Sequence, residues 1–322
     1  MRVGIDGLGV VGLRVARELI ATPGVEAVLA RSSRKGRVEL AQASLGEALR
    51  PWGDDEVPDL VVLCGAAGTH VTAAGYWLPH GVPVVSVSDD PADVTALLDL
   101  APIARHHDTT LLAGVAFSPG LSCILARHAA NALDEVVELQ VAMVGAGGPG
   151  CVKHRQRLLS EHGTELRDGE WIEAPGGSAK MLTWFPEPIG ARDVVKGNLT
   201  EPLLWRRLFP TATRLTARGA VDRSDRVWGR IPRPGPRSNE ADPGAFVVEV
   251  QGTVGGVVES LVYAVLDRPA TATAALVATL APMLVEGTLQ AGAHGVAEVV
   301  EPLPVLKELA RRGVKAATFD AA

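Results

Sequence analysis

The first third of the chain alternates short apolar runs with stretches of helical periodicity. Residues 1–6 are mainly apolar, and apolar side chains then recur at Val11, Val15 and Leu19, which is the spacing of one helix face. The run at 60–64 is continuously apolar, as is typical of a parallel strand buried on both faces. This alternation continues to about residue 113 and predicts the α/β class, with an open, doubly wound parallel sheet.

From about residue 118 the pattern changes, and strand-like runs dominate. After a helical stretch that ends near residue 133, such runs occur at 136–144, 246–250 and 257–266. The last two are separated by a glycine-rich turn at 252–256, which predicts a hairpin. We therefore expect a second, α+β domain for substrate binding or dimerisation.

These changes of pattern give the expected domain boundaries. We expect a first domain at 1–118, a second at 119–295, and a C-terminal segment, 296–322, that packs back on the first domain. The Ala-, Leu- and Val-rich helix predicted at 270–290 or the sheet face is a candidate dimer surface, although the helix pattern fits a buried core helix equally well.

Three glycines join the first predicted strand to the first predicted helix. In this spacing the first glycine permits a tight turn, the second lets the backbone approach a pyrophosphate, and the third lets the helix pack closely on the strand. The unpaired N–H groups and the positive end of the helix dipole would face the phosphates. We predict a Rossmann dinucleotide-binding unit, rather than a turn without a ligand, with the cofactor at Gly7, Leu8, Gly9, Val10, Val11 and Gly12.

The tip of the second strand predicts which cofactor is bound. NAD-specific sites usually place Asp or Glu there, whereas this chain has Arg31-Ser32-Ser33-Arg34-Lys35. Two guanidinium groups, an ammonium group and two hydroxyls suit a 2′-phosphate, and we expect no acid to repel it. The run therefore favours NADP (NADPH) over NAD, the alternative being a solvated basic loop.

Other residues at the carboxyl ends of predicted strands belong to the same expected site. Ligands of open α/β sheets bind at this edge. We expect the cofactor to contact Gly65, Ala66, Ala67, Ser88 and Pro119 there.

Composition narrows the function to small-molecule chemistry. The 322 residues carry 31 basic and 37 acidic side chains, and a net charge of −6 does not suit a nucleic-acid partner. The three cysteines have unrelated spacings, which excludes a zinc ribbon or a disulfide framework, and we expect no metal. No run is typical of a transmembrane helix, and the strand predicted at residue 2 leaves no room for a signal peptide, so we expect a cytoplasmic protein.

At this point the chain resembles the saccharopine dehydrogenase-like oxidoreductases, the group that includes lysine 6-dehydrogenases and carboxynorspermidine dehydrogenases. Besides the glycine turn, the matching segments are 85–90, 114–121, 184–190, 295–298 and 313–314, in the same order as in the group. The resemblance implies hydride transfer between a nicotinamide and a carbon bonded to nitrogen, through an imine, on an amino acid or polyamine. Residues 145–190 agree least with the group, so the substrate stays open.

Reduction of an imine needs a proton donor near the nitrogen. Asp89 and Asp90 follow a predicted strand and are the first candidates, although Asp90-Pro91 fits a helix cap equally well. His70 follows the preceding strand and is the next candidate, its alternative being a helix-start residue beside the cofactor ribose.

A substrate carboxylate needs a cationic seat or a helix end. Ser118-Pro119-Gly120 is expected to cap and open a helix, which gives an anion site at Ser118 and Gly120. The run at 153–157 offers His154 and Arg155 as cationic partners, although a charged run is more often a solvated face.

Three other functions are alternatives to an oxidoreductase acting on a C–N bond. A sugar or polyol dehydrogenase usually carries Glu-Lys-Pro where this chain has Ser88-Asp89-Asp90, and a short-chain dehydrogenase needs Tyr-x-x-x-Lys where this chain has Tyr76-x-x-x-His80. The third alternative is a cofactor-binding sensor or assembly protein without turnover. We expect a homodimer that binds a small-molecule substrate, and no nucleic acid or membrane.

Overall fold

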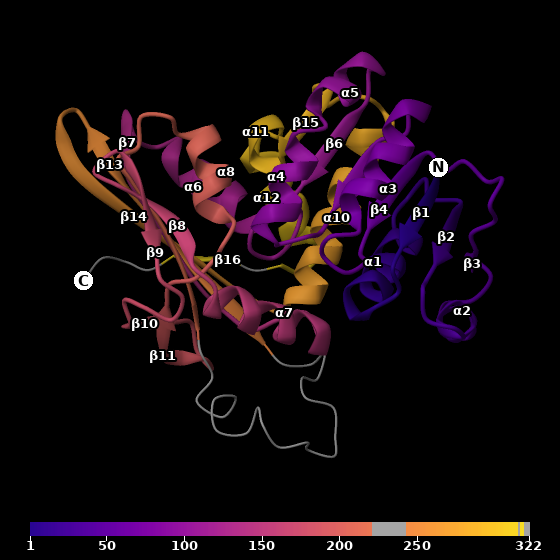
Figure 1. Cartoon of the computed structure of the whole chain (residues 1–322), viewed down its shortest axis with the longest axis horizontal. Coiled ribbons are helices and arrows are strands. Elements are labelled where there is room, and N and C mark those ends of the chain that lie inside the picture. The colour runs from indigo at the N-terminus through magenta and orange to yellow at the C-terminus, as the bar shows by residue number, and fades with distance from the viewer. Residues whose placement is uncertain (221–242, 315, 319–322) are drawn as a thin grey trace. The chain divides into compact units, whose positions relative to one another are not determined.

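The computed structural model of the chain describes residues 1–220, 243–314 and 316–318, which form two compact units (Figure 1). Unit 1 comprises Met1–Leu121 and Ala270–Arg312, and unit 2 comprises Ser122–Pro269 and Gly313–Ala322. The first boundary lies close to the predicted residue 118. The predicted end of the second domain at residue 295 is wrong, because the chain returns to unit 1 at Ala270.

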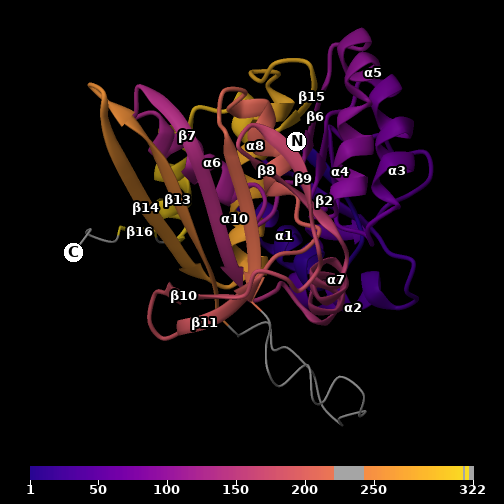
Figure 2. The ribbon, with the colours of Figure 1, turned by 60° about the vertical axis from the view of Figure 1, so that its left-hand side comes forward.

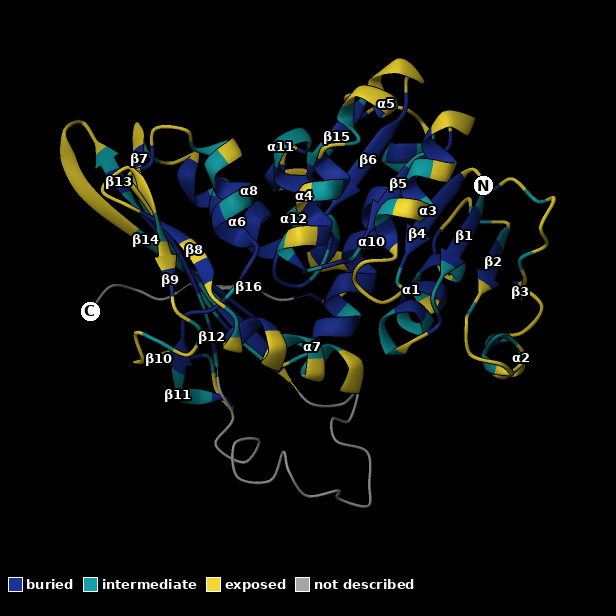
Figure 3. Cartoon of the chain, in the orientation of Figure 1, coloured by how far each residue is buried: buried dark blue, intermediate teal, exposed yellow. Residues whose placement is uncertain are grey.

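The described part of unit 1 is built on a seven-stranded sheet in which every pairing is parallel. The strand order is β15-β6-β5-β4-β1-β2-β3, which reverses at β1 and so confirms the doubly wound α/β prediction. In sequence the strands are β1 (Arg2–Asp6), β2 (Ala27–Arg31), β3 (Leu49–Pro51), β4 (Leu60–Leu63), β5 (Val84–Ser86), β6 (Thr110–Ala113) and β15 (Gly292–Gly295). β4 and β6 are buried throughout, as the continuous apolar run at 60–64 predicts (Figure 3).

Helices connect these strands. Those of unit 1 are α1 (Val10–Ile20), α2 (Arg37–Leu45), α3 (His70–Trp77) with a 3-10 turn η1 (Leu78–His80), α4 (Pro91–Leu98), α5 (Ala101–His106), α10 (Pro269–Val285), α11 (Val296–Val299) and α12 (Pro302–Arg311). Between β5 and β6 the chain forms two helices, α4 and α5, because Pro102 in the first turn of α5 cannot continue a preceding helix. None of the helices in the described ranges is long and apolar enough to cross a membrane.

Helix α10 is a core helix, and not the exposed dimer surface considered as one alternative. Every residue from Ala272 to Ala281 is buried, and Pro282 and Met283 are half-buried (Figure 3). After it, β15 adds a seventh strand beside β6, with Ala293 opposite Leu111. The last segment also divides: α12 lies in unit 1, as expected for 296–322, whereas β16 (Ala316–Thr318) pairs with β14 of unit 2.

The described part of unit 2 holds a mixed sheet of nine strands (Figure 2). Its main path runs β10-β11-β12-β7-β13-β14-β16, and β8 and β9 extend it from β12. The strands are β7 (Glu135–Val144), β8 (Gly163–Arg167), β9 (Glu170–Ala174), β10 (Met181–Phe185), β11 (Gly190–Val195), β12 (Arg214–Ala220), β13 (Gly244–Val254), β14 (Val257–Asp267) and β16. The predicted hairpin is β13–β14, with an unbroken register and only Gly255 and Gly256 in its turn, whereas the pairing of β13 with β7 shifts register at Gln251/Gly252.

The two faces of this sheet differ in polarity. On β7, Leu139, Val141 and Met143 are buried, whereas Glu138 and Gln140 alternate with them on the opposite face. Helices α6 (Leu121–Ala130) and α7 (Pro149–Ser160) pack on the apolar face, where the rings of His128 and Tyr263 lie 5.9 Å apart. The third helix of the described part of unit 2 is α8 (Glu201–Leu208). The sheet therefore has its core on one face and a polar surface on the other.

Candidate functional site

The turn between β1 and α1 has the geometry that its three glycines predict. Gly7 has a φ of +105°, which L side chains rarely adopt, and a Cβ on it would lie 2.6 Å from the carbonyl carbon of Cys64. A Cβ on Gly12 would collide with the carbonyl oxygen of Gly7, so the helix packs directly on the turn. Gly9, the N-cap of α1, is exposed, and a Cβ there would meet no atom within 4 Å. This open space at a helix N-terminus suits a pyrophosphate.

The remaining residues of the turn are buried or half-buried beside this space. Leu8 is buried, and Val10 and Val11 are half-buried. The N–H of Leu13 donates to the carbonyl oxygen of Gly9 at 3.0 Å, so α1 begins at once. The N–H of Gly7 donates to the carbonyl oxygen of Arg31 at 3.0 Å. The first N–H groups of a helix have no acceptor within it, and such groups suit an anion.

The basic loop after β2 differs from expectation in one respect. Asp6 ends β1 directly beside Arg31, and its Oδ2 lies 2.5 Å from the Nη2 of Arg31. The expectation that no acid stands near this loop is therefore wrong, because a parallel neighbour brings one in from the adjacent strand. Ser32 accepts a hydrogen bond from the N–H of Arg34 at 3.3 Å, and Ser33 and Arg34 are exposed.

A hollow of about 720 Å³ lies beside Arg31, at the carboxyl ends of β2 and β3 and the start of α3. It has the size of a small-molecule site. The residues that line it are Arg31, Trp52, Gly53, Asp54, Gly68, Thr69, Thr72, Ala73, Tyr76 and Trp77. All of them belong to unit 1, so the hollow is complete within that unit.

The loop after β4 lies at the same sheet edge. Gly65, Ala66 and Ala67 are exposed, and the hydroxyl of Thr69 donates to the carbonyl oxygen of Ala66 at 2.7 Å. A Cβ on Gly65 would lie 3.0 Å from that hydroxyl oxygen. The predicted cofactor residues of this loop therefore form a short turn before α3 that is closed by Thr69.

The position of His70 does not suit a proton donor. Its side chain is buried, its Nδ1 lies 2.7 Å from the hydroxyl of Ser86, and its Nε2 lies 3.2 Å from the carbonyl oxygen of Gly65. Both ring nitrogens are thus occupied by groups at the ends of β4 and β5. His70 begins α3, as the alternative interpretation has it, and its place beside the cofactor ribose stays a prediction.

The two candidate aspartates in the loop after β5 have different surroundings. Asp90 is the N-cap of α4 and is buried, and its Oδ1 accepts from the N–H groups of Ala92 at 2.9 Å and Asp93 at 3.2 Å. This carboxylate is the helix cap that the alternative interpretation described. Asp89 is half-buried and precedes the cap, while the hydroxyl of the buried Ser88 accepts from the N–H of Asp90 at 3.4 Å.

The segment Ser118-Pro119-Gly120 is a tight turn that ends before its helix begins. The N–H of Ala116 donates to the carbonyl oxygen of Pro119 at 3.1 Å, and the N–H of Leu121, the first residue of α6, donates to that of Ala116 at 3.0 Å. Gly120 has a φ of +102°, and a Cβ on it would lie 2.6 Å from the N of Ala116. The expectation that Pro119 lies in the first helical turn is therefore wrong, because the backbone folds back on Ala116.

The distant strand β15 contributes to this edge, which the local sequence pattern did not predict. The N–H of Gly295, which ends β15, donates to the Oε1 of Glu298 at 2.9 Å, so Glu298 closes the start of α11. The only sequence signal was the resemblance at 295–298. Trp52 was also missed, although a glycine in β1 at Gly4 marks the place where its ring packs.

His154 and Arg155, the predicted substrate partners, belong to α7 of unit 2. Both are half-buried, and the Nη1 of Arg155 donates to the sulfur of Met143 on β7. Arg157 is exposed and pairs with Glu161 at 2.8 Å, one helical turn away. The run is thus partly the solvated helix face of the alternative interpretation, with Arg155 directed at the sheet.

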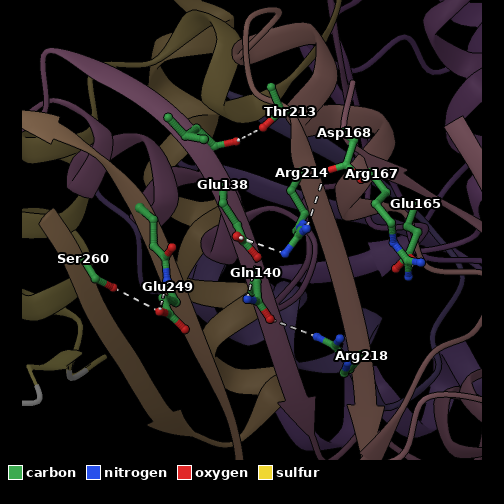
Figure 4. A network of polar contacts seen from close by, with 12 residues as sticks. Glu138, Gln140, Glu165, Arg167, Asp168, Thr213, Arg214, Arg218, Glu249 and Ser260 are labelled. Atoms are coloured by element: carbon green, nitrogen blue, oxygen red, sulfur yellow. Dashed lines mark hydrogen bonds and ion pairs between the residues drawn. The ribbon is translucent and has the colours of Figure 1, made fainter. Parts of the chain in front are cut away.

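The polar face of the unit 2 sheet carries a connected network (Figure 4). Gln140 donates to Glu138 at 2.8 Å and accepts from Arg218 at 3.0 Å. Glu165 pairs with Arg167 at 2.7 Å and with the buried Lys196. Burial lowers the pKa of the Arg218 guanidinium, and the charge of Glu165 opposes this effect.

No protein-family model and no curated protein sequence matches the chain. Solved structures do match over nearly its whole length. Apo saccharopine dehydrogenase (L-Glu forming) from Saccharomyces cerevisiae has a TM-score of 0.71 at 13% identity, with 99% of this chain and 100% of that chain covered.

Two further matches are weaker. DAP dehydrogenase from C. glutamicum, in complex with DAP, has a TM-score of 0.52 at 17% identity, covering 97% of this chain and 98% of that one. GenD2 from gentamicin A biosynthesis, in complex with NAD, has a TM-score of 0.50 at 15% identity, covering 100% and 97%. At these identities the likeness concerns the fold. The chain therefore has the two-domain fold of saccharopine dehydrogenase, with a Rossmann-type unit and a second unit built on a mixed sheet.

Proposed function

We propose that this protein is an NADP-dependent oxidoreductase that transfers hydride to or from a carbon bonded to nitrogen in an amino-acid-like small molecule. The observation that carries the proposal is Gly9, the exposed N-cap of α1, which faces open space at the carboxyl edge of a parallel sheet. The fold shared with saccharopine dehydrogenase supports the C–N chemistry.

The residues present suit a dinucleotide. The turn at Gly7–Gly12 would hold the pyrophosphate, and the hollow beside Arg31 would take the adenosine half. Ser32, Ser33 and Arg34 would hold a 2′-phosphate, while Gly65, Ala66, Ala67, Ser88 and Pro119 would line the path of the cofactor. When bound, NADP supplies or accepts the hydride.

Asp89 is the proton donor or acceptor in this proposal. Asp90 is used as the cap of α4, and His70 is held between Ser86 and Gly65, so these two residues position the edge around Asp89. A carboxyl group beside the reacting nitrogen delivers a proton as an imine is reduced, and takes it back in the reverse direction.

We propose the turn at Ser118 and Gly120 of unit 1 as a seat for a substrate carboxylate, and the cations His154 and Arg155 of unit 2 as a second, separate candidate. Arg155 offers a fork of N–H donors that matches a carboxylate. The preferred substrates are accordingly amino acids, or keto acids together with amines. We propose a homodimer as the working form.

The first test is calorimetric titration of the whole protein with NADPH and NADH. NADPH should bind more tightly than NADH, and a double variant, Arg31→Ala with Arg34→Ala, should lose NADPH affinity. Tighter binding of NADH, or unchanged NADPH affinity in the double variant, contradicts the NADP assignment.

The second test is a screen of amino acids, keto acids and amines for NADPH consumption or NADP reduction. Asp89→Asn should lower kcat at least about tenfold while NADPH affinity stays unchanged. Asp99→Asn is the matched control, since this aspartate is exposed at the opposite end of α4. Turnover of alcohols instead of amines would indicate a C–OH dehydrogenase, and NADPH binding without any turnover would indicate a sensor.

A further inference from the structure

Arg31 is held by groups from three different strand ends of unit 1. Its backbone ends β2, and its Nη2 lies 2.5 Å from the carboxylate of Asp6, at the end of β1. Its Cζ lies 4.6 Å above the ring of Trp52, which follows β3. A planar guanidinium group over an indole ring is attracted to the face of the ring. These two contacts fix the direction of a side chain that would otherwise be long and mobile.

Trp52 is itself a rigid support. Its Nε1 donates to the carbonyl oxygen of Glu56 at 3.0 Å, and its ring stacks on Trp77 with centroids 5.3 Å apart and an interplanar angle of 20°. Its Cη2 lies 2.5 Å from where a Cβ on Gly4 would be, so β1 carries a glycine at that point to admit the ring. The indole cannot turn without disturbing the sheet or the neighbouring helix.

Arg31, Trp52 and Trp77 together line one side of the hollow of about 720 Å³. Flat groups in fixed positions are the surface that a purine ring needs for stacking. Tyr76, which is exposed, adds a further ring to the lining.

Arg31 and Arg34 of the basic loop differ in whether a carboxylate compensates their charge. The carboxylate of Asp6 compensates the charge of Arg31, which weakens the attraction between Arg31 and an added phosphate. Arg34, in contrast, is exposed and makes no side-chain ion pair within the described part of the chain. An uncompensated guanidinium is the stronger ligand for a phosphate dianion.

On the basis of the proposed function, we infer that Asp6 and Trp52 hold Arg31 as a platform on which the adenine ring stacks, and that Arg34 carries the preference for NADP. Arg31 then contributes equally to the binding of NADP and NAD, although it lies where a 2′-phosphate ligand is expected. Asp6 is a positioning residue that keeps Arg31 flat against Trp52.

The test is calorimetry on the whole protein with adenosine 2′,5′-bisphosphate and AMP, two probes that differ in the 2′-phosphate. Arg31→Ala should weaken both probes by the same factor, about three- to thirtyfold. Arg34→Ala should weaken the bisphosphate about tenfold or more and leave AMP unchanged. Arg17→Ala, at an exposed arginine in the last turn of α1, is the matched control and should change neither affinity.

A larger loss of bisphosphate than of AMP affinity in Arg31→Ala overturns the inference, because Arg31 would then be a phosphate ligand. Trp52→Leu should repeat the pattern of Arg31→Ala, and Trp52→Phe, which keeps a ring face, should restore most of the affinity. If Trp52→Leu fails to fold, Asp6→Asn is the deciding variant. It releases Arg31 and should raise the affinity for the bisphosphate relative to that for AMP. An unchanged ratio of the two affinities contradicts the inference. Wild-type protein that binds neither NADPH nor NADH refutes the proposed function itself.

Discussion

Gly9 and Gly12 have different surroundings, although both belong to the glycine motif between β1 and α1. Gly12 lies against the backbone of Gly7, where no side chain has room, whereas Gly9 borders open space. Glycine at position 12 is therefore needed for the fold, whereas glycine at position 9 is needed for the proposed ligand. Substitution by alanine therefore separates stability from binding.

We expect Gly12→Ala to lower the free energy of unfolding by about 1–3 kcal/mol, because the added methyl group collides with the Gly7 carbonyl. Gly9→Ala should cost about 1 kcal/mol or less, the difference between glycine and alanine at an N-cap, yet abolish tight NADPH binding. Urea denaturation and calorimetry measure the two effects. Equal losses of stability in the two variants would contradict this assignment.

Asp267 gives a prediction about pH. Burial raises the pKa of its carboxyl group, and the hydrogen bond from the N–H of Arg268 opposes this effect. A carboxyl group whose pKa is higher in the folded state destabilises the fold when it is ionised, and this penalty disappears as the pH falls below its unfolded value. Asp267→Asn, which keeps an acceptor oxygen, should raise Tm at neutral pH and lose this advantage near pH 3. A constant difference in Tm across this range would contradict the cause given.

At the scale of elements, the start of helix α4 gives two adjacent aspartates different roles. Two neighbouring aspartates follow β5, and the second is the N-cap of α4, with an extended backbone of φ −81° and ψ 123°. Its carboxylate then accepts two N–H groups of the first turn. The first aspartate lies at the carboxyl edge of the sheet, the edge at which ligands of open α/β folds bind.

We predict that Asp90→Ala lowers the free energy of unfolding by about 1 kcal/mol, the usual effect of removing an N-cap. Asp89→Ala should lower kcat much more than Asp90→Ala does. Thermal unfolding and initial rates on the two variants distinguish the roles. Loss of turnover in Asp90→Ala at full stability would move the catalytic role to Asp90.

At the scale of the whole molecule, unit 1 is discontinuous in sequence. Residues 1–121 supply six of its strands, and 270–312 supply the buried helix α10 and the edge strand β15. Leu111 and Ala113 on β6 pair with this last strand and are fully buried. Without the second segment, β6 would be an exposed, apolar edge strand, which favours aggregation.

We therefore expect a fragment of residues 1–121 to be insoluble or to unfold without cooperativity. A chain in which residues 1–121 are joined by a short glycine-serine linker to 270–312 should unfold cooperatively and bind NADPH. Circular dichroism and calorimetry test both chains. A stable 1–121 fragment that binds NADPH would show that α10 and β15 are dispensable.

The sequence by itself determined the strand-turn-helix start, the α/β alternation to β6, the hairpin β13–β14 and the two-unit organisation. These features depend on residues that are close in the chain, such as the spacing Gly7-x-Gly9-x-x-Gly12 and the continuous apolar run of β4, so periodicity and turn residues reveal them. The structure chose between the two roles that the sequence left open for Asp90, which is a helix cap. Only the tertiary structure decided that Asp6 and Trp52 hold Arg31 and that β15 completes the first sheet. Each of these depends on strand register or on segments far apart in the sequence, where local pattern carries no information about which side chains meet.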